Sequence, residues 1–352
     1  MEVESISIDE WASERSSSEV SVFHRPETLR VIDRHVSGDI DIFAGYNGDR
    51  LVGVFPVNTR NNAVGSIVTS PPPGLGLPHQ GPILLPASPK QRKREKLNQT
   101  FTAAVLERLS TESSFSLLRA ICLPEHTDPR PFQWEGLDVE TRFTYRLDVG
   151  DRTADEVKQG FSRSLRREIG AATEEPITVD TEGIDGARLI YEDCAERYAE
   201  QDRTYSLTWS FVRDLLVSLG DHTRVFVSRG PDDEYLGGII VIYSDTTAYF
   251  WQGGVRHTFG DATTNSFLHW EIISDLLENP EYEHITQYDL FGANTARLCE
   301  YKSKFGGQLV PYYVVESAGP GMTVAKSAYG LVGRLGTLAE NEWSNRTASE
   351  SD

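Results

Sequence analysis

A glycine-containing loop between a strand and a helix is the first place in this sequence where chemistry can be located. Residues 249–252 end an apolar strand, and helical periodicity resumes at Thr264. The N–H groups at a helix start carry partial positive charge and attract phosphate or a developing oxyanion. Arg256 adds a formal charge, and Gly260 allows a ligand to approach the backbone closely. The loop predicts a phosphate-binding site, with an ordinary glycine loop as the alternative.

A lysine near the end of the chain is the second candidate. The segment 288–307 contains a strand ending at Gly292 and then a short helix that carries Lys302. The chain has only seven lysines, so arginine supplies most of its positive charge. A primary ammonium can balance a phosphate or the charge on a tetrahedral intermediate. The alternative is a solvated lysine near a helix C-terminus, where the helix dipole favours a cation.

Two basic segments complete the set of charged candidates. Arg163, Arg166 and Arg167 share one helix face, because they are spaced i, i+3, i+4. This face could hold an anionic acceptor or a phosphate-bearing donor, or could pair with the glutamates between positions 168 and 175. The basic run at positions 90–96 is interpreted as a solvated helix start.

Other common chemistries have no motif here. The sequence contains no Gly-x-Ser-x-Gly elbow, no Walker loop and no His-Glu-x-x-His pair, and its eight histidines are scattered. Cys122, Cys194 and Cys299 lack the spacing of a metal site or of a disulfide framework. We therefore expect no metal site and no permanently bound cofactor.

The composition indicates a folded, strongly acidic protein. The chain has 352 residues, a length typical of two domains or one large one, and its net charge is −19. An acid excess with few lysines is typical of proteins from salt-loving organisms, and an ordinary acidic cytosolic protein is the alternative. The field repels nucleic acid, so DNA is not an expected partner and RNA would need a local basic patch. We expect a cytoplasmic monomer, because the first 18 residues are too polar for a signal peptide and the longest apolar stretch is strand-sized.

Two similar hairpins indicate an internal repeat. Residues 42–57 and 225–242 each read as a strand, a turn and a second strand that begins with leucine and glycine. Helical patterns precede each hairpin, and a strand, a helix and further strands follow it. This order predicts a mixed α/β fold with two tandem domains, at residues 1–149 and 150–318, followed by a C-terminal helix and frayed tail at 319–352.

The remaining elements follow from periodicity and from turn residues. Helices are expected at residues 9–18, 26–36, 89–109, 155–173, 187–202, 207–219, 264–278, 295–305 and 322–343. Strands outside the hairpins are expected at residues 64–69, 115–122, 141–148, 247–252, 286–291 and 309–316.

The second half resembles the FemAB-like branch of the GNAT acyltransferase superfamily. The resemblance rests on residues 251–254, 267–271, 288–292 and, above all, 301–307, which read Tyr-Lys-Ser-Lys-Phe-Gly-Gly. The basic helix at 162–173 and the Pro/Gly-rich loop of the first half are also similar to that family. The resemblance spans about residues 8–317 and implies two acetyltransferase-like domains in tandem.

The resemblance also implies an activity and a set of site residues. It implies an N-acyltransferase that moves an acetyl or acyl group from a CoA-type donor to a small-molecule, glycan or peptide amine. Alternatives are an aminoacyl-tRNA-dependent peptidyltransferase of the Fem type, with tRNA as a partner, and a non-catalytic ligand-binding module. Lys302 matches the family lysine that handles negative charge, and Asp289 and Glu271 are candidate bases. The candidate donor-binding residues are Tyr249, Trp251, Gln252, Arg256, Gly260 and Asn294.

The loop before the helix expected at residues 264–278 departs from the usual phosphate motif. Acetyl-CoA enzymes typically carry Arg/Gln-x-x-Gly-x-Gly/Ala there, whereas Arg256 and Gly260 are one residue too far apart. The sequence therefore predicts an acyltransferase and leaves its donor open between acyl-CoA and aminoacyl-tRNA.

Overall fold

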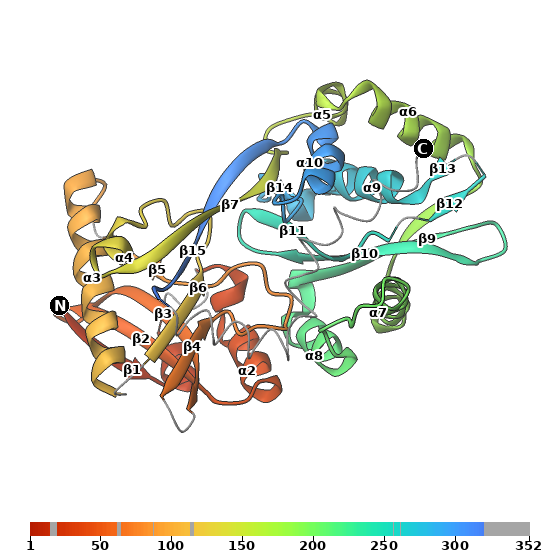
Figure 1. Ribbon diagram of the computed structural model, residues 1–352. Coiled ribbons are helices and arrows are strands. Elements are labelled where there is room, and N and C mark those ends of the chain that lie inside the picture. Colours follow the sequence, from red (N-terminus) through yellow and green to blue (C-terminus); the bar gives the residue numbers. More distant parts are fainter. Residues whose placement is uncertain are drawn as a thin grey trace. The chain divides into compact units, whose positions relative to one another are not determined.

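The computed structural model describes residues 1–14, 20–61, 65–86, 88–112, 116–255, 257–260 and 262–319 (Figure 1). The chain packs as two compact units. Among the described residues, the first unit comprises Met1–Arg142 and the end of the chain from Pro311, and the second comprises Phe143–Val310. The first unit is therefore completed by a strand from the end of the chain. The predicted domain bounds, 1–149 and 150–318, stay a prediction.

The first unit is a mixed sheet with helices. Its strands follow the order β1-β2-β3-β4-β6-β15, and β5 pairs with β3. The strands are β1 (Glu2–Ile6), β2 (Asp39–Asn47), β3 (Arg50–Asn61), β4 (Ser66–Ser70), β5 (Ile83–Leu84), β6 (Ser116–Ile121) and β15 (Gln308–Ser317). The helices are α1 (Ile8–Ser13), α2 (Pro26–His35), α3 (Gln91–Glu112) and α4 (Arg130–Trp134). Strands β4 and β6 pair in parallel, and α3 connects them.

The core of the first unit lies between α3 and the sheet. Phe43, Phe55 and Val57 of the hairpin are buried with Phe101 and Val105 of α3. The four-residue spacing within α3 keeps its two side chains on one face. The period of two along the strands brings Phe55 and Val57 to the same face of the sheet. The apolar pattern of the predicted hairpin and helix therefore becomes the core of this unit.

The second unit repeats this plan. Its strand order is β7-β14-β11-β10-β9-β8, and β11 pairs in parallel with β14. The strands are β7 (Leu137–Asp148), β8 (Thr178–Glu182), β9 (Thr223–Arg229), β10 (Tyr235–Tyr243), β11 (Thr247–Gly253) and β14 (Gln287–Asp289), with a small hairpin of β12 (Thr258–Phe259) and β13 (Ala262–Thr263). The helices are α5 (Ala154–Gly160), α6 (Arg163–Glu174), α7 (Ile184–Ala199), α8 (Trp209–Leu219), α9 (Thr264–Glu278) and α10 (Ala296–Lys302).

Helices cover both faces of the second sheet (Figure 1). Ile239 and Val241 of β10 belong to one core cluster with Leu268 and Ile272 of α9. A side chain at Gly238 would instead meet Ile190 of α7. Because alternate residues of a strand face opposite sides, α9 and α7 lie on opposite faces of the sheet. Both faces are apolar, which explains the nearly continuous hydrophobic run of β10.

The structure corrects one predicted helix. The helix expected at residues 155–173 is two helices, α5 and α6, because the backbone at Phe161 is extended. The Phe161 ring is buried against Phe305 and Trp270. The next residue, Ser162, caps α6 through its hydroxyl and donates its N–H to the Lys304 carbonyl at 2.8 Å. Tertiary packing of one aromatic ring therefore breaks a helix that the local periodicity favours.

Two edge strands were not predicted, and one expected helix falls outside the residues that the structure describes. β1 and β8 are largely exposed and polar, so they carry little hydrophobic signal. The expected helix at 322–343 lies outside the described residues. Within the described part of the chain, no helix is long and apolar enough to cross a membrane.

Candidate active site

Two parallel strands part at the centre of the second unit. β11 and β14 pair from Thr247 to Tyr249 on one strand and from Gln287 to Asp289 on the other. β14 then ends, while β11 continues to Gly253. Trp251 is an extra residue in β11, because its neighbours pair in register with consecutive residues of β10. Such a bulge bends and twists its strand, so the end of β11 diverges from the line of β14.

Lys302 lies at the end of β14. Its side chain is only 6% exposed. The ammonium donates hydrogen bonds to the carbonyls of Phe291 and of Gly292, the latter at 2.9 Å. Both of these residues have a positive φ, 49° and 68°. The ammonium also lies 5.7 Å from the centre of the Phe250 ring of β11. A buried positive charge is thus held where the two parallel strands separate.

Asp289 is fully buried and accepts hydrogen bonds from three groups. The Thr144 hydroxyl donates to Oδ1 at 2.5 Å, the Phe291 N–H donates to Oδ1 at 2.8 Å, and Arg146 Nε donates to Oδ2 at 2.9 Å. Burial of a carboxylate is tolerated when charge and hydrogen bonds compensate for lost water. These partners link β14 to β7 and favour a positioning role for Asp289, whereas its role as a base stays a prediction.

A buried histidine and tyrosine lie beside Lys302. His269 Nδ1 is 2.9 Å from the Tyr288 hydroxyl. The His269 ring also packs against Phe250 and Phe305. Burial, together with the smaller effect of the nearby Lys302 charge, lowers the pKa of His269 to about 3. Burial likewise raises the pKa of Tyr288. The pair is neutral and therefore adds no charge to compete with Lys302.

At the start of α9, one backbone N–H and one side chain are bonded to other groups of the protein. The Thr264 N–H donates to the His257 carbonyl at 3.2 Å. The Ser266 hydroxyl donates to Glu168 Oε2 at 2.7 Å, and Lys304 donates to the other oxygen of that carboxylate. The hairpin of β12 and β13 fills the loop where a phosphate motif was expected. This arrangement agrees with the irregular spacing of Arg256 and Gly260.

Of the two predicted phosphate-binding residues in this loop, the structure describes Gly260. Gly260 has a φ of 55°, and a side chain there would lie 2.8 Å from Glu175 Oε1. Glycine is therefore required by the backbone and by the closeness of Glu175. Arg256 lies outside the described residues.

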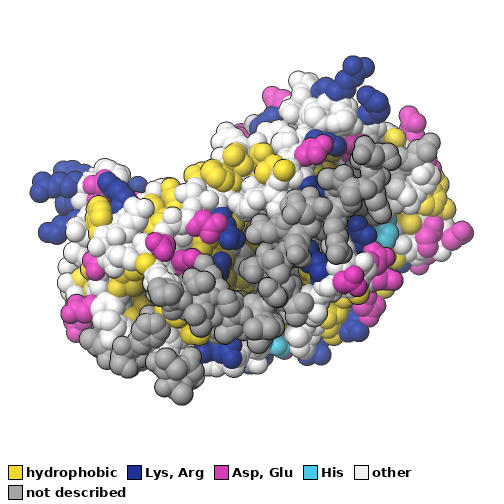
Figure 2. All heavy atoms as spheres, viewed as in Figure 1, with side chains coloured by type: hydrophobic (Ala, Val, Ile, Leu, Met, Phe, Trp, Pro, Cys, Tyr) yellow, Lys and Arg dark blue, Asp and Glu magenta, His cyan; other side chains and the backbone are white. Residues whose placement is uncertain are grey.

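The three arginines of α6 form an exposed basic face (Figure 2). The expected pairing with neighbouring glutamates does not occur in the described part of the chain. Glu168 instead bonds Ser266 and Lys304. Arg166 donates to the Gln159 carbonyl at 3.3 Å. α6 packs against α9 and β13 through its apolar side, and its arginine face is exposed to solvent, where an anion can reach it.

The four remaining candidate donor-binding residues each contact a different part of the second unit. Trp251 is buried against Phe211, and Gln252 Oε1 accepts a hydrogen bond from the Tyr205 hydroxyl at 2.5 Å. Asn294 binds the backbone of Phe143, accepting from its N–H at 2.9 Å and donating to its carbonyl at 3.2 Å. Tyr249 is buried in β11.

Glu271 lies on α9, partly buried. Burial raises the pKa of this carboxyl, and so does the charge of Glu278, whereas Lys158 opposes the shift. Two residues after His269 on a helix, Glu271 projects about 200° away from it. The structure therefore gathers Lys302, Asp289, Tyr249 and Asn294 around the end of β14, and it does not bring Glu271 to them.

Sequence reasoning gave no role to several residues of this cluster. Thr144 and Arg146 are 145 and 143 positions from Asp289, so no spacing could link them. No motif singled out His269 among the scattered histidines, and its burial beside Lys302 follows only from packing. Tyr288 belongs to the motif that carried the resemblance, but no pattern indicated its hydrogen bond to His269.

An ion pair anchors the loop that follows β11. His257 Nε2 is 3.0 Å from both oxygens of Asp193, which also accepts a hydrogen bond from the Tyr235 hydroxyl at 3.1 Å. The hydrogen bond to Asp193 raises the pKa of His257 above 6.5, and the nearby charge of Glu196 acts in the same direction. The protonated imidazole is therefore favoured in the folded protein.

We predict that this pair makes stability depend on pH. Because the folded-state pKa of His257 is raised, its stabilisation is fully present below about pH 6.5 and is lost as the pH rises through the folded-state pKa. The imidazole is partly exposed, so solvent screening keeps the effect below about 1 kcal/mol. Asp193→Asn should flatten the free energy of unfolding between about pH 6 and pH 9, measured by urea titration. An unchanged pH slope would contradict the prediction.

The second unit contains a domain of the acetyltransferase type. Residues 159–303 match the family model described as "Acetyltransferase (GNAT) domain". No curated protein matches the chain at a significant level. The second unit thus contains the GNAT domain that the motifs predicted.

Solved structures extend the likeness to the whole fold. FemX has a TM-score of 0.64 at 11% identity, covering 89% of this chain and 97% of FemX. The C-terminal domain of a putative lysylphosphatidylglycerol synthetase from Agrobacterium fabrum has a TM-score of 0.52 at 13% identity, covering 94% and 97%. L-PGS from Bacillus licheniformis has a TM-score of 0.51 at 12% identity, covering 88% and 96%. The GNAT part of the predicted assignment is confirmed by the domain match, and the fold of the chain is shared with FemX.

Proposed function

We propose that this chain is an N-acyltransferase that moves an acetyl or larger acyl group from a CoA thioester to an amine. The observation that carries the proposal is the position of Lys302. Its buried ammonium is bound to the carbonyls of Phe291 and Gly292, at the point where β11 and β14 part. A positive charge that is fixed before the reaction stabilises a developing oxyanion without reorganisation.

The proposed reaction needs little covalent help from the protein. A neutral amine attacks the thioester carbonyl carbon and forms the new C–N bond, while the carbonyl oxygen gains negative charge. Collapse of this intermediate breaks the C–S bond, and the sulfur leaves as a thiolate that takes up the proton of the amine. The Lys302 charge acts on the oxyanion, and the end of β11 positions the donor.

No base is required at the reacting centre for this scheme. The carboxylate of Asp289 already accepts three hydrogen bonds. Glu271 lies on the other side of α9, near Lys158. Asp289 thus supports the site by fixing the end of β14, and the transferred proton passes to the leaving thiolate or to water.

The basic face of α6 is the proposed seat of the donor phosphates. At the start of α9 the Thr264 N–H is bonded to His257 and the Ser266 hydroxyl to Glu168, so further positive charge would strengthen phosphate binding. Arg163 and Arg167 form no ion pair among the described residues, and α6 packs beside α9. Guanidinium groups bind phosphate in a bidentate manner, which suits this role.

We predict that the arginine face controls donor affinity. Changing Arg163, Arg166 and Arg167 together to glutamine should weaken acetyl-CoA binding by about tenfold or more, because charge-assisted hydrogen bonds to phosphate are lost. Isothermal titration calorimetry measures this change directly.

A matched triple variant separates local contacts from overall charge. It changes three arginines that are paired with a nearby acid, namely Arg188, Arg197 and Arg213. This control removes the same formal charge and should change the dissociation constant by less than about twofold. Equal weakening in the two triples would contradict a phosphate seat on α6.

Calorimetry with acetyl-CoA and with aminoacylated tRNA tests the proposed donor. Saturable binding of acetyl-CoA, followed by release of CoA thiol when an amine is added, supports the proposal. The acceptor class would be found by testing sugar amines, peptide amines and small-molecule amines in the same assay. Binding of neither donor by the folded chain would instead favour a non-catalytic ligand-binding module.

A transferase that uses aminoacyl-tRNA is the second candidate. The shared fold with FemX and the exposed arginines of α6 favour it. Its affinity for tRNA should fall steeply as salt rises, because counterions are released on binding. The net charge of −19 opposes such binding, so a flat salt response or no binding would remove this candidate.

A further inference from the structure

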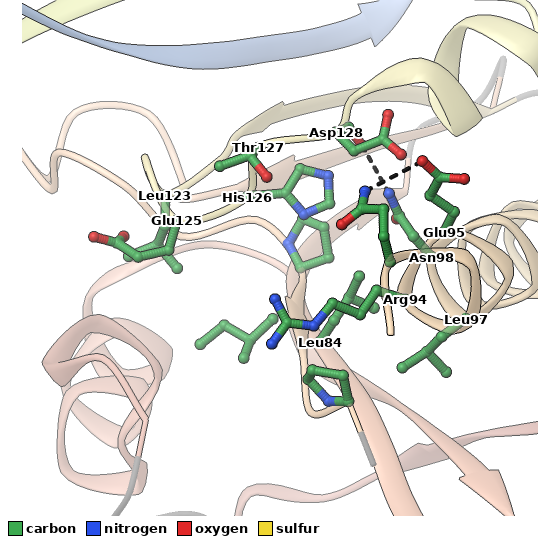
Figure 3. A pocket seen from close by; sticks show the side chains of 14 residues that line it. Leu84, Arg94, Glu95, Leu97, Asn98, Leu123, Glu125, His126, Thr127 and Asp128 are labelled. Atoms are coloured by element: carbon green, nitrogen blue, oxygen red, sulfur yellow. Dashed lines mark hydrogen bonds between the residues drawn. The ribbon is translucent and has the colours of Figure 1, made fainter. Parts of the chain in front are cut away.

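The first unit contains a pocket that the proposed function does not use. Its volume is about 200 Å³ (Figure 3). Leu84 and Leu123 supply apolar wall, and Arg94, Asn98 and His126 supply polar groups. The pocket lies between the start of α3, the segment around β5 and the loop after β6. A space of this size accommodates a phosphate group and a few further atoms.

The position of the pocket repeats that of the candidate donor site. In the first unit, β4 and β6 are parallel neighbours connected by α3. In the second unit, β11 and β14 are parallel neighbours connected by α9. Both helices begin beyond the carboxyl end of the first parallel strand, which is where open α/β sheets bind ligands. The pocket therefore occupies a place where the same topology favours a ligand.

The start of α3 is strongly basic. Positions 90–96 contain three lysines and two arginines against one glutamate, in a chain whose net charge is −19. Figure 2 shows a cluster of dark blue side chains at one end of α3. The first N–H groups of a helix lack intrahelical acceptors and carry partial positive charge. At α3, the N–H groups of Lys93 and Arg94 donate to the Lys90 carbonyl, so those of Gln91 and Arg92 are the ones that can face a ligand. Charge and helix direction thus favour an anion here.

Arg94 is the cation of this segment that lines the pocket (Figure 3). Its Nε donates to the Ser88 carbonyl at 3.4 Å, and it forms no ion pair among the described residues. Two acids of the pocket wall, Glu95 and Asp128, are instead paired with Arg130, at 3.1 Å and 2.7 Å. A third, Glu125, is exposed to solvent. Arg94 is therefore the uncompensated charge beside the pocket.

His126 provides an independent sign of a missing partner. The side chain lines the pocket and is 8% exposed, and Nε2 has no hydrogen-bond partner in the described structure. Burial lowers the pKa of His126 to about 4, so the ring is neutral at ordinary pH. A buried polar atom without a partner is costly, and native proteins rarely leave one unless a ligand or water completes it.

We propose that this pocket binds the phosphate group of a small phosphorylated ligand, with Arg94 and the first N–H groups of α3 on its oxygens and His126 on a further ligand atom. A phosphate offers acceptors in several directions, which suits donors that come from a helix start, a guanidinium and an imidazole. The inference concerns the first unit and does not depend on acyl transfer.

Calorimetric titration of the full-length chain with inorganic phosphate and with glucose 6-phosphate tests the proposal. Arg94→Gln should raise both dissociation constants by about tenfold, because a charge-assisted contact is lost. Arg92→Gln, on the same helix start but outside the pocket wall, should change them by less than about twofold. His126→Phe should weaken glucose 6-phosphate binding by about fivefold or more.

Each other outcome counts against the site. No binding by the wild-type chain at about 10 mM ligand, or equal weakening by the two arginine variants, would overturn the proposal. Equal affinity for acetate would show a general carboxylate site, which also overturns it. If Arg94→Gln fails to fold by circular dichroism, Arg94→Lys replaces it, because it keeps the charge and loses the bidentate fork. The Lys302→Met variant should bind phosphate normally, so failure of the acyltransferase proposal is distinguishable.

Discussion

We expect Lys302→Met to lower the rate of acyl transfer by about a hundredfold or more. Methionine fills a similar volume but carries no charge, so the positive charge beside the developing oxyanion is lost. The hydrogen bonds that hold the carbonyls of Phe291 and Gly292 are lost as well. Release of CoA thiol from acetyl-CoA, measured with an excess of amine, reports kcat. The loss should fall on kcat, because the ammonium lies at the reacting end of the proposed site and not at the donor phosphates.

Lys304→Met is the matched control for this experiment. Lys304 lies two residues away and pairs with Glu168 at the surface, with 24% of each side chain exposed. Its loss should change kcat by less than about threefold, since a partly exposed ion pair contributes little. Both variants need a circular dichroism spectrum that matches the wild type. Activity of Lys302→Met within about threefold of the wild type would exclude the assigned role.

Asp289→Asn has the second large expected effect, on stability. The substitution keeps the shape of the side chain and removes its charge, so the Arg146 guanidinium lies beside a neutral amide. One of the amide positions also presents hydrogens where the carboxylate accepted bonds from Thr144, Phe291 or Arg146. Breaking one side of a buried ion pair costs about 3–5 kcal/mol. Urea unfolding followed by circular dichroism should show a loss of this size.

Asp148→Asn provides a comparison on the neighbouring strand. Asp148 is exposed and pairs in register with Gln287, two residues before Asp289 on β14. Among the described residues, its carboxylate accepts only long, exposed hydrogen bonds from Gly150 and Gln287, so its substitution should change the free energy of unfolding by about 0.5 kcal/mol or less. A loss below about 1 kcal/mol for Asp289→Asn would show that the buried pair contributes no more than a surface one.

The hairpins and the helices show how far local pattern reaches. The helix predicted at 264–278 is α9, Thr264–Glu278, because its apolar residues repeat with helical period and a threonine precedes it. The mixed α/β class and the tandem plan are also confirmed, by the domain match and by the shared fold. The polar strand β8 and the break at Phe161 were missed. An exposed edge strand lacks alternation, and the break depends on an aromatic contact with Phe305.

In the candidate site, too, one residue could be predicted from the sequence and its surroundings could not. Lys302 was found from residue type and motif, since lysine is rare in this chain and the final motif is specific. The surroundings that give it meaning were not accessible, because Phe250, His269 and Phe291 approach it only after β11, α9 and β14 pack together. For Arg94, the sequence predicted no binding role, and the structure indicates one. The basic run around it predicted a solvated helix start, and only the wall formed with His126 indicates a ligand.

The sequence by itself determined the fold class, the repeat and the lysine of the site, because periodicity, turn residues and residue type are local properties. The tertiary structure decided which side chains share that lysine's environment and which carboxylates are already bound. It also decided that the Thr264 N–H of α9 is bonded to the His257 carbonyl and that the Ser266 hydroxyl is bonded to Glu168. These properties depend on contacts between residues about 7 to 145 positions apart, and no local pattern encodes such contacts.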